Sequence, residues 1–203
     1  MNHSTHNKIL ETVTNSRKGS LLFPSDFVET GNTNAVKTAL SRLAQDGTLQ
    51  RLAKGIYLYP KEDSLLGTLQ PSLEEIAQAI AKRDGVRIMP TGISALNKLG
   101  LSTQVPMKMV YLTDGQPKKI TIGKSAITFK RAAPKKLALK GKISSLVIQA
   151  LEELGQKVLK DEKIVNRITE LLQKEDKKII KQDAKFASAW IARLLFTITE
   201  KMK

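Results

Sequence analysis

The sequence lacks the side chains on which most catalytic and metal sites depend. It has no cysteine and two histidines among 203 residues. The lack of cysteine excludes disulfides, thiolate–metal sites and thiol catalysis, and it suits a reducing compartment. His3 and His6 have the spacing of a weak metal pair without a partner carboxylate or cysteine. A Ser/His/Asp triad would have to use one of them. We therefore expect no enzyme, no cofactor and no metal.

Long apolar runs are missing as well. The nearest candidate, residues 186–199, is shorter than the roughly 18 residues that a membrane-spanning segment needs, and it contains Arg193. The polar N-terminal stretch does not resemble a signal peptide. We expect a cytoplasmic protein without a membrane partner.

Acidic residues are scarce relative to basic ones. Lysine and arginine number 34 and aspartate and glutamate 19, for a net charge of +15. Such an excess favours a polyanionic partner, most often nucleic acid. The excess is +2 in residues 1–63, +8 in residues 64–155 and +5 in residues 156–203. The middle of the chain is therefore its most basic part.

The most informative stretch is residues 32–59, which predicts a helix followed by a hairpin. Between Thr33 and Asp46, Val36, Leu40 and Leu43 form one buried stripe of a 3.6-residue repeat. The opposite face is polar and has no acidic residue; it contains Asn34, Lys37, Thr38, Ser41, Gln45 and, at its edge, Arg42. These are side chains that bind base edges and phosphates. A small helix–hairpin core without a ligand is the alternative.

The predicted hairpin would lie beside this helix as a wing. Strands are expected at 48–52 and 56–59, with the turn at Ala53-Lys54-Gly55. We expect Asn34, Lys37, Thr38 and Ser41 to read base edges in the major groove. Arg42, Arg51 and Lys54 are expected to hold phosphates. Tyr57 would pack under the wing, with its hydroxyl reaching a phosphate.

The other elements predict an α+β protein of two domains. Helices at about 4–16 and 25–29 precede the helix above, so residues 1–62 would form a winged helix-turn-helix. A linker at about 62–71 leads to a mixed domain, residues 70–203, with a helical C-terminal extension from about 156. That domain would have helices at 71–83, 92–99, 142–154, 161–174 and 184–201, a short strand at 86–89, and three antiparallel strands at 107–113, 118–123 and 126–131.

Several motifs resemble one protein family. The runs are LLFPSDF (21–27), AVKTALSRLAQDGTLQRLAKGIY (35–57), TGISALNKLGLSTQVP (91–106) and YLTDGQPKKITIGKSAITFKR (111–131). Together they resemble the AbiEi-type antitoxin regulators of type IV toxin–antitoxin and abortive-infection systems, over about residues 8–155. The resemblance implies a sequence-specific repressor that binds its own operator and acts as antitoxin. It also implies a nucleotidyltransferase-type toxin as functional partner, and leaves open whether the two touch.

Two other functions stay open from the residues alone. One is a DNA-binding regulator or accessory protein of a mobile element, without antitoxin activity. The other is an enzyme whose C-terminal domain modifies the toxin or a nucleotide, although neither converging acids nor a phosphate loop is found. The basic residues of the middle segment are a candidate second surface for DNA backbone, for an acidic protein or RNA, or for solubility alone; they include Lys118, Lys119, Lys124, Lys130, Arg131, Lys135 and Lys136.

Overall fold

The computed structural model describes residues 4–103 and 107–202, so His3 lies outside the described residues. The chain has mixed α and β structure and divides into two compact units. The N-terminal unit comprises the described residues up to 83 together with 120–125, and the C-terminal unit comprises 84–119 and the residues from 126 onward. The division passes through strand β8 (Lys118–Ile122). Helix α3 (Leu73–Asp84) falls in the N-terminal unit except for its last residue, whereas the sequence-based boundary lies at residues 62–70.

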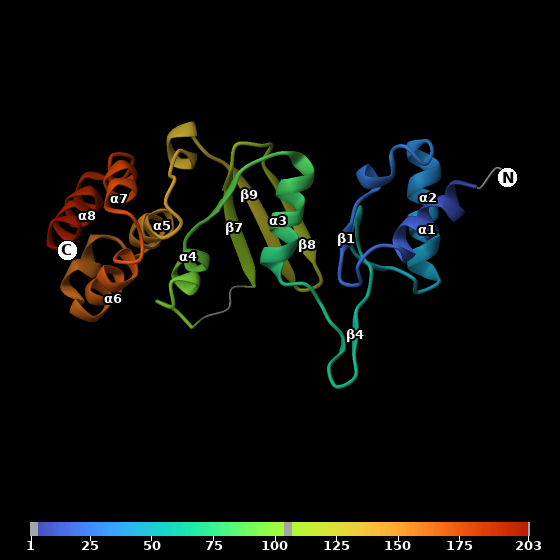
Figure 1. Ribbon diagram of the computed structural model, residues 1–203, viewed down its shortest axis with the longest axis horizontal. Helices are drawn as coiled ribbons and strands as arrows, with labels where there is room; N and C mark the ends of the chain where they lie inside the picture. The colour runs from blue at the N-terminus through green and yellow to red at the C-terminus, as the bar shows by residue number, and fades with distance from the viewer. Residues whose placement is uncertain (1–3, 104–106, 203) are drawn as a thin grey trace. The chain divides into compact units, whose positions relative to one another are not determined.

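The N-terminal unit is built around two helices that pack against each other, as Figure 1 shows. Its first elements are α1 (Thr5–Thr14), β1 (Leu21–Leu22), η1 (Pro24–Phe27), α2 (Thr33–Gln45), β2 (Gln50–Ala53) and β3 (Ile56–Leu58). The strands form an antiparallel sheet in the order β1-β3-β2. The core beneath it includes Ile9, Phe27, Leu40 and Leu43. The apolar stripe predicted for residues 33–46 is the buried side of α2.

The predicted helix at 25–29 is wrong in type, because the segment forms a four-residue 3-10 turn, η1. The Asp26 carboxylate accepts a hydrogen bond from the Phe23 amide at 2.8 Å. The Thr30 amide donates to the Phe27 carbonyl at 3.0 Å. Both bonds join residues three positions apart, which is the spacing of a 3-10 turn and not the four-residue spacing of an α-helix.

The predicted linker contains a small hairpin that sequence patterns did not indicate. Strands β4 (Glu62–Asp63) and β5 (Gly67–Thr68) pair antiparallel and end in an exposed tip (Figure 1). The Asp63 carboxylate accepts hydrogen bonds from the Leu65 and Leu66 amides at 2.9 and 3.0 Å. The Leu65 side chain is 92% exposed. Helix α3 (Leu73–Asp84) follows, opened by reciprocal bonds between Ser72 and Glu75.

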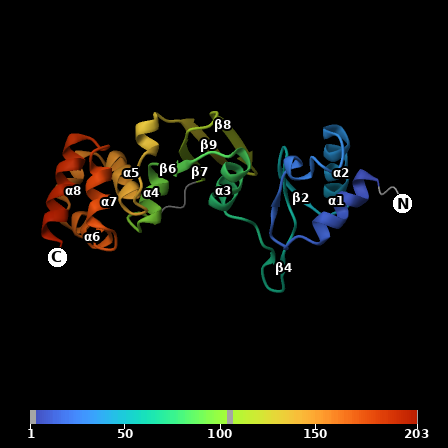
Figure 2. The ribbon, with the colours of Figure 1, turned by 45° about the horizontal axis from the view of Figure 1, so that its top comes forward.

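The second sheet is mixed, which corrects the prediction of three antiparallel strands. It contains β6 (Ile88–Pro90), β7 (Lys108–Thr113), β8 (Lys118–Ile122) and β9 (Ser125–Arg131) in the order β6-β7-β9-β8. Strands β7 and β9 are parallel, with Tyr111 opposite Phe129, and β6 is antiparallel to β7. Figure 2 labels all four strands. Strands β7 and β8 are therefore consecutive in the chain but not neighbours in the sheet, because β9 lies between them.

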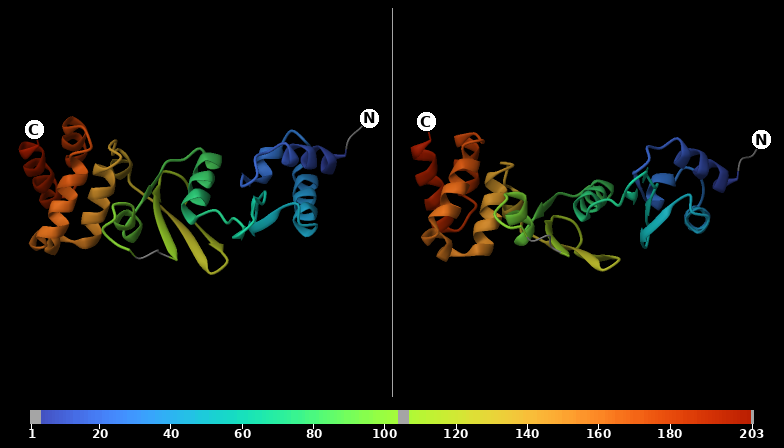
Figure 3. Two further views of the ribbon diagram at one scale, coloured as in Figure 1. Left: turned by 60° about the horizontal axis from the view of Figure 1, so that its bottom comes forward. Right: turned by 90° about the horizontal axis from the view of Figure 1, so that it is seen from below.

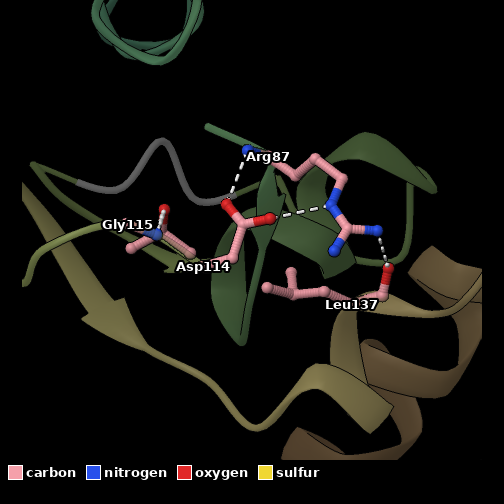
Figure 4. A network of polar contacts seen from close by, with 5 residues as sticks. Arg87, Asp114, Gly115 and Leu137 are labelled. Atoms are coloured by element: carbon pink, nitrogen blue, oxygen red, sulfur yellow. Dashed lines mark hydrogen bonds and ion pairs between the residues drawn. The ribbon is translucent and has the colours of Figure 1, made fainter. Parts of the chain in front are cut away.

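Asp114 follows β7, and its carboxylate binds Arg87, the residue before β6. In Figure 4 the Arg87 guanidinium lies between the Asp114 carboxylate and the Leu137 carbonyl. Arg87 Nε and its backbone amide each donate to Asp114 at 2.8 Å, and Nη1 donates to Leu137 at 3.4 Å. These bonds hold the end of β7 against the start of β6.

The C-terminal unit ends in a bundle of helices, coloured orange to red in Figure 3. The helical elements of this unit are α4 (Ile93–Lys98), η2 (Pro134–Leu137), α5 (Ser144–Leu154), η3 (Gln156–Lys160), α6 (Glu162–Leu172), α7 (Lys177–Ala184) and α8 (Ala189–Lys201). Helix α7 contacts both α5 and α8, and all three helices contribute to one apolar core. The helix expected at 184–201 begins at Ala189, and α7 was not predicted.

Two carboxylates, those of Asp183 and Glu175, accept hydrogen bonds from the segment that leads into α5. Asp183, which is 0% exposed, accepts bonds from the Lys140 amide, the Gly141 amide and the Ser144 hydroxyl at 2.9, 2.9 and 2.7 Å. Glu175 accepts the Ile143 and Ser144 amides at 2.9 and 2.7 Å. Residues from the α6–α7 region therefore satisfy the free amides at the start of α5.

Candidate nucleic-acid interface

The candidate interface begins with the exposed face of α2. Asn34, Lys37 and Thr38 are exposed and Ser41 is half-buried, while Val36 and Leu40, on the other side of the helix, are 1% and 0% exposed. At 3.6 residues per turn, the face from Lys37 to Arg42 covers an arc of about 140°. The structure therefore brings the four predicted base-reading residues together on one solvent-facing side.

Capping interactions hold this helix in place. The Asn32 side chain accepts a hydrogen bond from the Ala35 amide at 2.9 Å, which satisfies one free amide of the first turn. The helix ends at Gln45, Asp46 is its C-cap residue, and Gly47 follows with φ +83°, a conformation that favours glycine. Gln45 and Arg42, near this end, are exposed. The polar face thus belongs to a helix with a defined cap at each end.

Acidic side chains are absent from α2 itself, and the nearest one in sequence is engaged. Hydrogen bonds from the backbone and side chain of Thr48 lower the pKa of Asp46, and the Thr48 amide lies 3.0 Å from the carboxylate. Asp46 is thus charged at neutral pH and held beyond the end of the helix. Lys37 and Arg42 give the face itself a positive charge.

The β2–β3 hairpin supplies two further cations. Arg51 is exposed on β2, and Lys54 is exposed in the turn next to Gly55, whose φ is +72°. The register between the two strands shifts between Arg51 and Ala53, just before the turn. The predicted strand from residue 48 begins only at Gln50.

Tyr57 has a different place from the other predicted residues. It lies on β3 between Leu22 and Arg51, is 4% exposed and belongs to the apolar core of the N-terminal unit. Its burial agrees with the expected packing under the hairpin. We leave it out of the candidate interface, because a ring so enclosed offers almost no surface to a phosphate.

The second basic surface is divided in the structure. Lys118 pairs with Asp84 and lies 5.3 Å from the centre of the Phe129 ring. Lys136 pairs with Glu152 at 3.1 Å. Lys119, Lys124, Lys130, Arg131 and Lys135 are exposed. Because side chains alternate along a strand, neighbours such as Lys130 and Arg131 point to opposite faces of the sheet. Lys130 and Arg131 therefore do not share one face of the sheet.

One exposed side chain beside α2 was missed by sequence reasoning. Val28, in the turn between η1 and α2, is 70% exposed. A single valine between two helical stretches shows no periodicity, so no pattern marks it. The exposure of this side chain is visible only once the turn is folded.

The described residues also bear on metals and membranes. In residues 4–103 and 107–202 no group of three or more His, Cys, Asp or Glu side chains is placed to hold a metal ion. Within the same ranges no helix has the length and apolar character needed to cross a membrane.

Comparison with known proteins identifies a family. Residues 8–180 match the model of DUF6088, a family of unknown function. The chain belongs to this family. No curated protein matches the sequence. Among solved structures, the chain is similar to the RV2827C protein from Mycobacterium tuberculosis, with a TM-score of 0.46, 10% identity, and coverage of 96% of this chain and 81% of that one. A likeness of this extent says nothing about function.

Proposed function

We propose that α1, η1, α2 and the β2–β3 hairpin, within the predicted domain that ends at residue 62, form a winged helix-turn-helix that binds DNA, and that the protein represses transcription from its own promoter. In this proposal α2 is the recognition helix and the β2–β3 hairpin is the wing. The observation that carries it is the exposed, acid-free face of α2 next to a hairpin with two exposed cations. A solvated helix face ordinarily mixes acidic and basic side chains, so this composition favours a polyanion.

Each side chain has a role that follows from its chemistry. Asn34 and Lys37 donate hydrogen bonds to base edges, and the hydroxyls of Thr38 and Ser41 adapt to either donor or acceptor. Arg42 at the edge of the face, and Arg51 and Lys54 on the hairpin, bind phosphates and fix the orientation of the helix. The bases thus provide specificity, and the phosphates provide affinity that depends on salt.

The antitoxin role is a separate part of the proposal and rests on the family resemblance alone. The motifs in residues 21–57 and 91–131 support an AbiEi-type regulator that counters a nucleotidyltransferase-type toxin. DNA binding does not depend on this part. A regulator or accessory protein of a mobile element would use the same α2 face and would lack the toxin partner.

DNA binding is tested by titrating the full-length protein against the DNA upstream of its own gene and against a scrambled duplex, at several salt concentrations. A preference for the upstream duplex of roughly a thousandfold or more is the expected result. Equal and steeply salt-dependent binding to both duplexes would show that the charge binds DNA but that α2 does not read this site.

Three variants separate the roles. Lys37→Ala and Asn34→Ala are expected to lower the ratio of specific to scrambled binding. Lys54→Ala is expected to weaken both equally and to reduce the log–log salt slope by about 0.9. Lys163→Ala, an exposed lysine on α6, is the control for loss of one charge. An unchanged specificity ratio in both α2 variants would refute the assignment of the reading face.

The antitoxin role is tested by expressing the adjacent gene alone and together with this protein. If that gene encodes a toxic nucleotidyltransferase, co-expression is expected to restore growth, and α2 variants that no longer bind the operator are expected to restore it equally. Failure to restore growth would refute the antitoxin role. A mass change of the toxin after incubation with nucleotide and this protein would instead support an enzyme.

A further inference from the structure

Helix α7 presents a face of lysines to solvent. Lys178, Lys181 and Lys185, the last of which is the C-cap residue, are exposed together with Gln182. At 3.6 residues per turn these positions fall within an arc of about 100°. The fold therefore gathers three cations on one side of a short helix, and this side is called the α7 face below.

The acidic residues of the segment do not neutralise the α7 face. Asp183 is the one acidic residue within α7, whose residues are all described; it is 0% exposed and accepts hydrogen bonds from the segment before α5. Asp176, the N-cap, accepts a hydrogen bond from the Lys178 amide at 2.6 Å. Among the described residues no carboxylate forms an ion pair with Lys178, Lys181 or Lys185.

Helix stability does not account for this arrangement. Like charges three or four positions apart on a helix repel each other and lower its stability. The helix dipole favours Lys181 in the last turn but disfavours Lys178 in the first. The preceding helix, α6, has the usual mixture of signs, with Arg167 paired to Glu170 at 3.1 Å. The α7 face therefore points to a negatively charged partner outside the chain.

The composition of the α7 face fits phosphate better than protein or lipid. Protein interfaces are depleted in lysine and enriched in aromatic side chains, methionine and arginine. A helix that lies on a membrane inserts apolar side chains beside its lysines. The isoleucines of α7 are not available for either role, because Ile179 is half-buried and Ile180 is 0% exposed in the apolar core. Lysine binds a phosphate as a point charge, whatever the base sequence.

Resting on the proposed DNA binding by α2, we propose that the α7 face binds the phosphate backbone of the same duplex, outside the stretch that α2 reads. Both surfaces belong to one chain, so a duplex held by α2 is present at α7 at a high effective concentration. Successive lysines of the face are separated by about 4.5 and about 6 Å along the helix axis. Consecutive phosphates of one DNA strand are separated by about 3.4 Å along the duplex axis, so the flexible lysine side chains can reach separate phosphates. The contact adds affinity without sequence specificity.

The test compares the full-length wild type with Lys178→Gln/Lys181→Gln/Lys185→Gln, the α7 glutamine variant, on two duplexes that contain the upstream site. The short duplex is the shortest one that the variant binds with its full affinity, and the long duplex has about ten more base pairs, one helical turn, on each side. On the long duplex the wild type is expected to have a log–log salt slope about 2.7 steeper than the variant, because each lost phosphate contact removes about 0.9. Its advantage in Kd then shrinks about fortyfold between about 50 and about 200 mM salt. On the short duplex the two proteins are expected to bind alike.

Two further variants serve as controls. Lys157→Gln/Lys160→Gln/Lys163→Gln removes three other exposed lysines of the C-terminal unit and is expected to keep the wild-type slope. Replacing the three lysines of the α7 face with arginine keeps the charge and is also expected to keep the slope. Thermal melting of the α7 glutamine variant is expected to match the wild type, because all three side chains are exposed.

The outcomes distinguish this proposal from the proposed function. A preference for the upstream duplex with equal slopes for the wild type and the α7 glutamine variant would overturn the role of α7 and leave the DNA-binding proposal intact. An equal loss of slope in the control glutamine variant would show that net charge alone acts, and would also overturn it. A loss confined to duplex RNA of the same length would assign the face to RNA and overturn it as well. A slope difference on the long duplex without any preference for the upstream sequence would overturn the repressor and support the α7 contact.

Discussion

Replacing Asp183 with alanine is expected to lower the free energy of unfolding of the C-terminal unit by about 4 kcal/mol. Asp183 accepts three hydrogen bonds, at 2.7 to 2.9 Å, from the segment that opens α5. Two of the donors, the Gly141 amide and the Ser144 hydroxyl, belong to buried residues. Leaving a buried donor without its charged acceptor costs about 2 kcal/mol each. Lys140 is exposed, so its amide regains water and adds little.

The assay is urea unfolding followed by tryptophan fluorescence. The protein has one tryptophan, Trp190, which packs against the core of the C-terminal unit, so the signal reports this unit. Asp161→Ala is the matched control, because Asp161 caps α6 with its side chain from an exposed position. It is expected to cost about 1 kcal/mol. Asp183→Asn retains one acceptor oxygen and is expected to fall between the two.

A loss in Asp183→Ala no larger than in Asp161→Ala would refute the reasoning. It would mean that removing a buried carboxylate near Glu175 offsets the lost hydrogen bonds, as happens where desolvation outweighs attraction. A change in the slope of unfolding against urea would instead indicate that the variant alters the compactness of the folded or unfolded state.

Three further changes test other parts of the fold. Leu40→Ala, at a 0% exposed core position, should cost about 2–5 kcal/mol, whereas Leu65→Ala, at 92% exposed, should cost less than about 0.5 kcal/mol, both from urea unfolding. Gly31→Ala should cost about 1–3 kcal/mol in the same assay, because the new Cβ meets Thr5. Hydrogen bonds from Arg87 lower the pKa of Asp114 in the folded protein. The ionised carboxylate therefore stabilises the fold fully above the unfolded pKa of about 3.9, and this contribution is lost as the pH falls through the lower folded pKa. In urea unfolding at pH 7 and pH 3, Asp114→Asn should show a smaller fall in the free energy of unfolding than the wild type.

Helix α2 shows why some elements were predictable from sequence. Its cap at Asn32, its stripe of Val36, Leu40 and Leu43 and its stop at Gly47 lie within one stretch and agree with one another. Local signals of this kind depend only on residues a few positions apart. The polar face could be predicted in the same way, because it consists of the positions on the helix opposite the buried stripe.

Helix α7 shows how a local signal is lost. Its sequence, KKIIKQDA, has one buried isoleucine, Ile180, and a high density of charge. The remaining signal was Asp176, whose side chain accepts a hydrogen bond from the Lys178 amide at 2.6 Å as an N-cap. Eight residues are too few for a periodic pattern. Contacts with α5 and α8 stabilise this helix, and those contacts are not local.

The sequence alone determined the basic character, the helix α2 with its acid-free face and the hairpin that follows, because composition, periodicity and caps act over short distances. Tertiary structure decided the parallel pairing of β7 with β9, since alternation in a strand is the same for either direction of its neighbour. It also decided that Lys118 and Lys136 are paired, that Tyr57 is enclosed and that Val28 faces water. Each of these depends on which distant residues meet, and that is a property of packing.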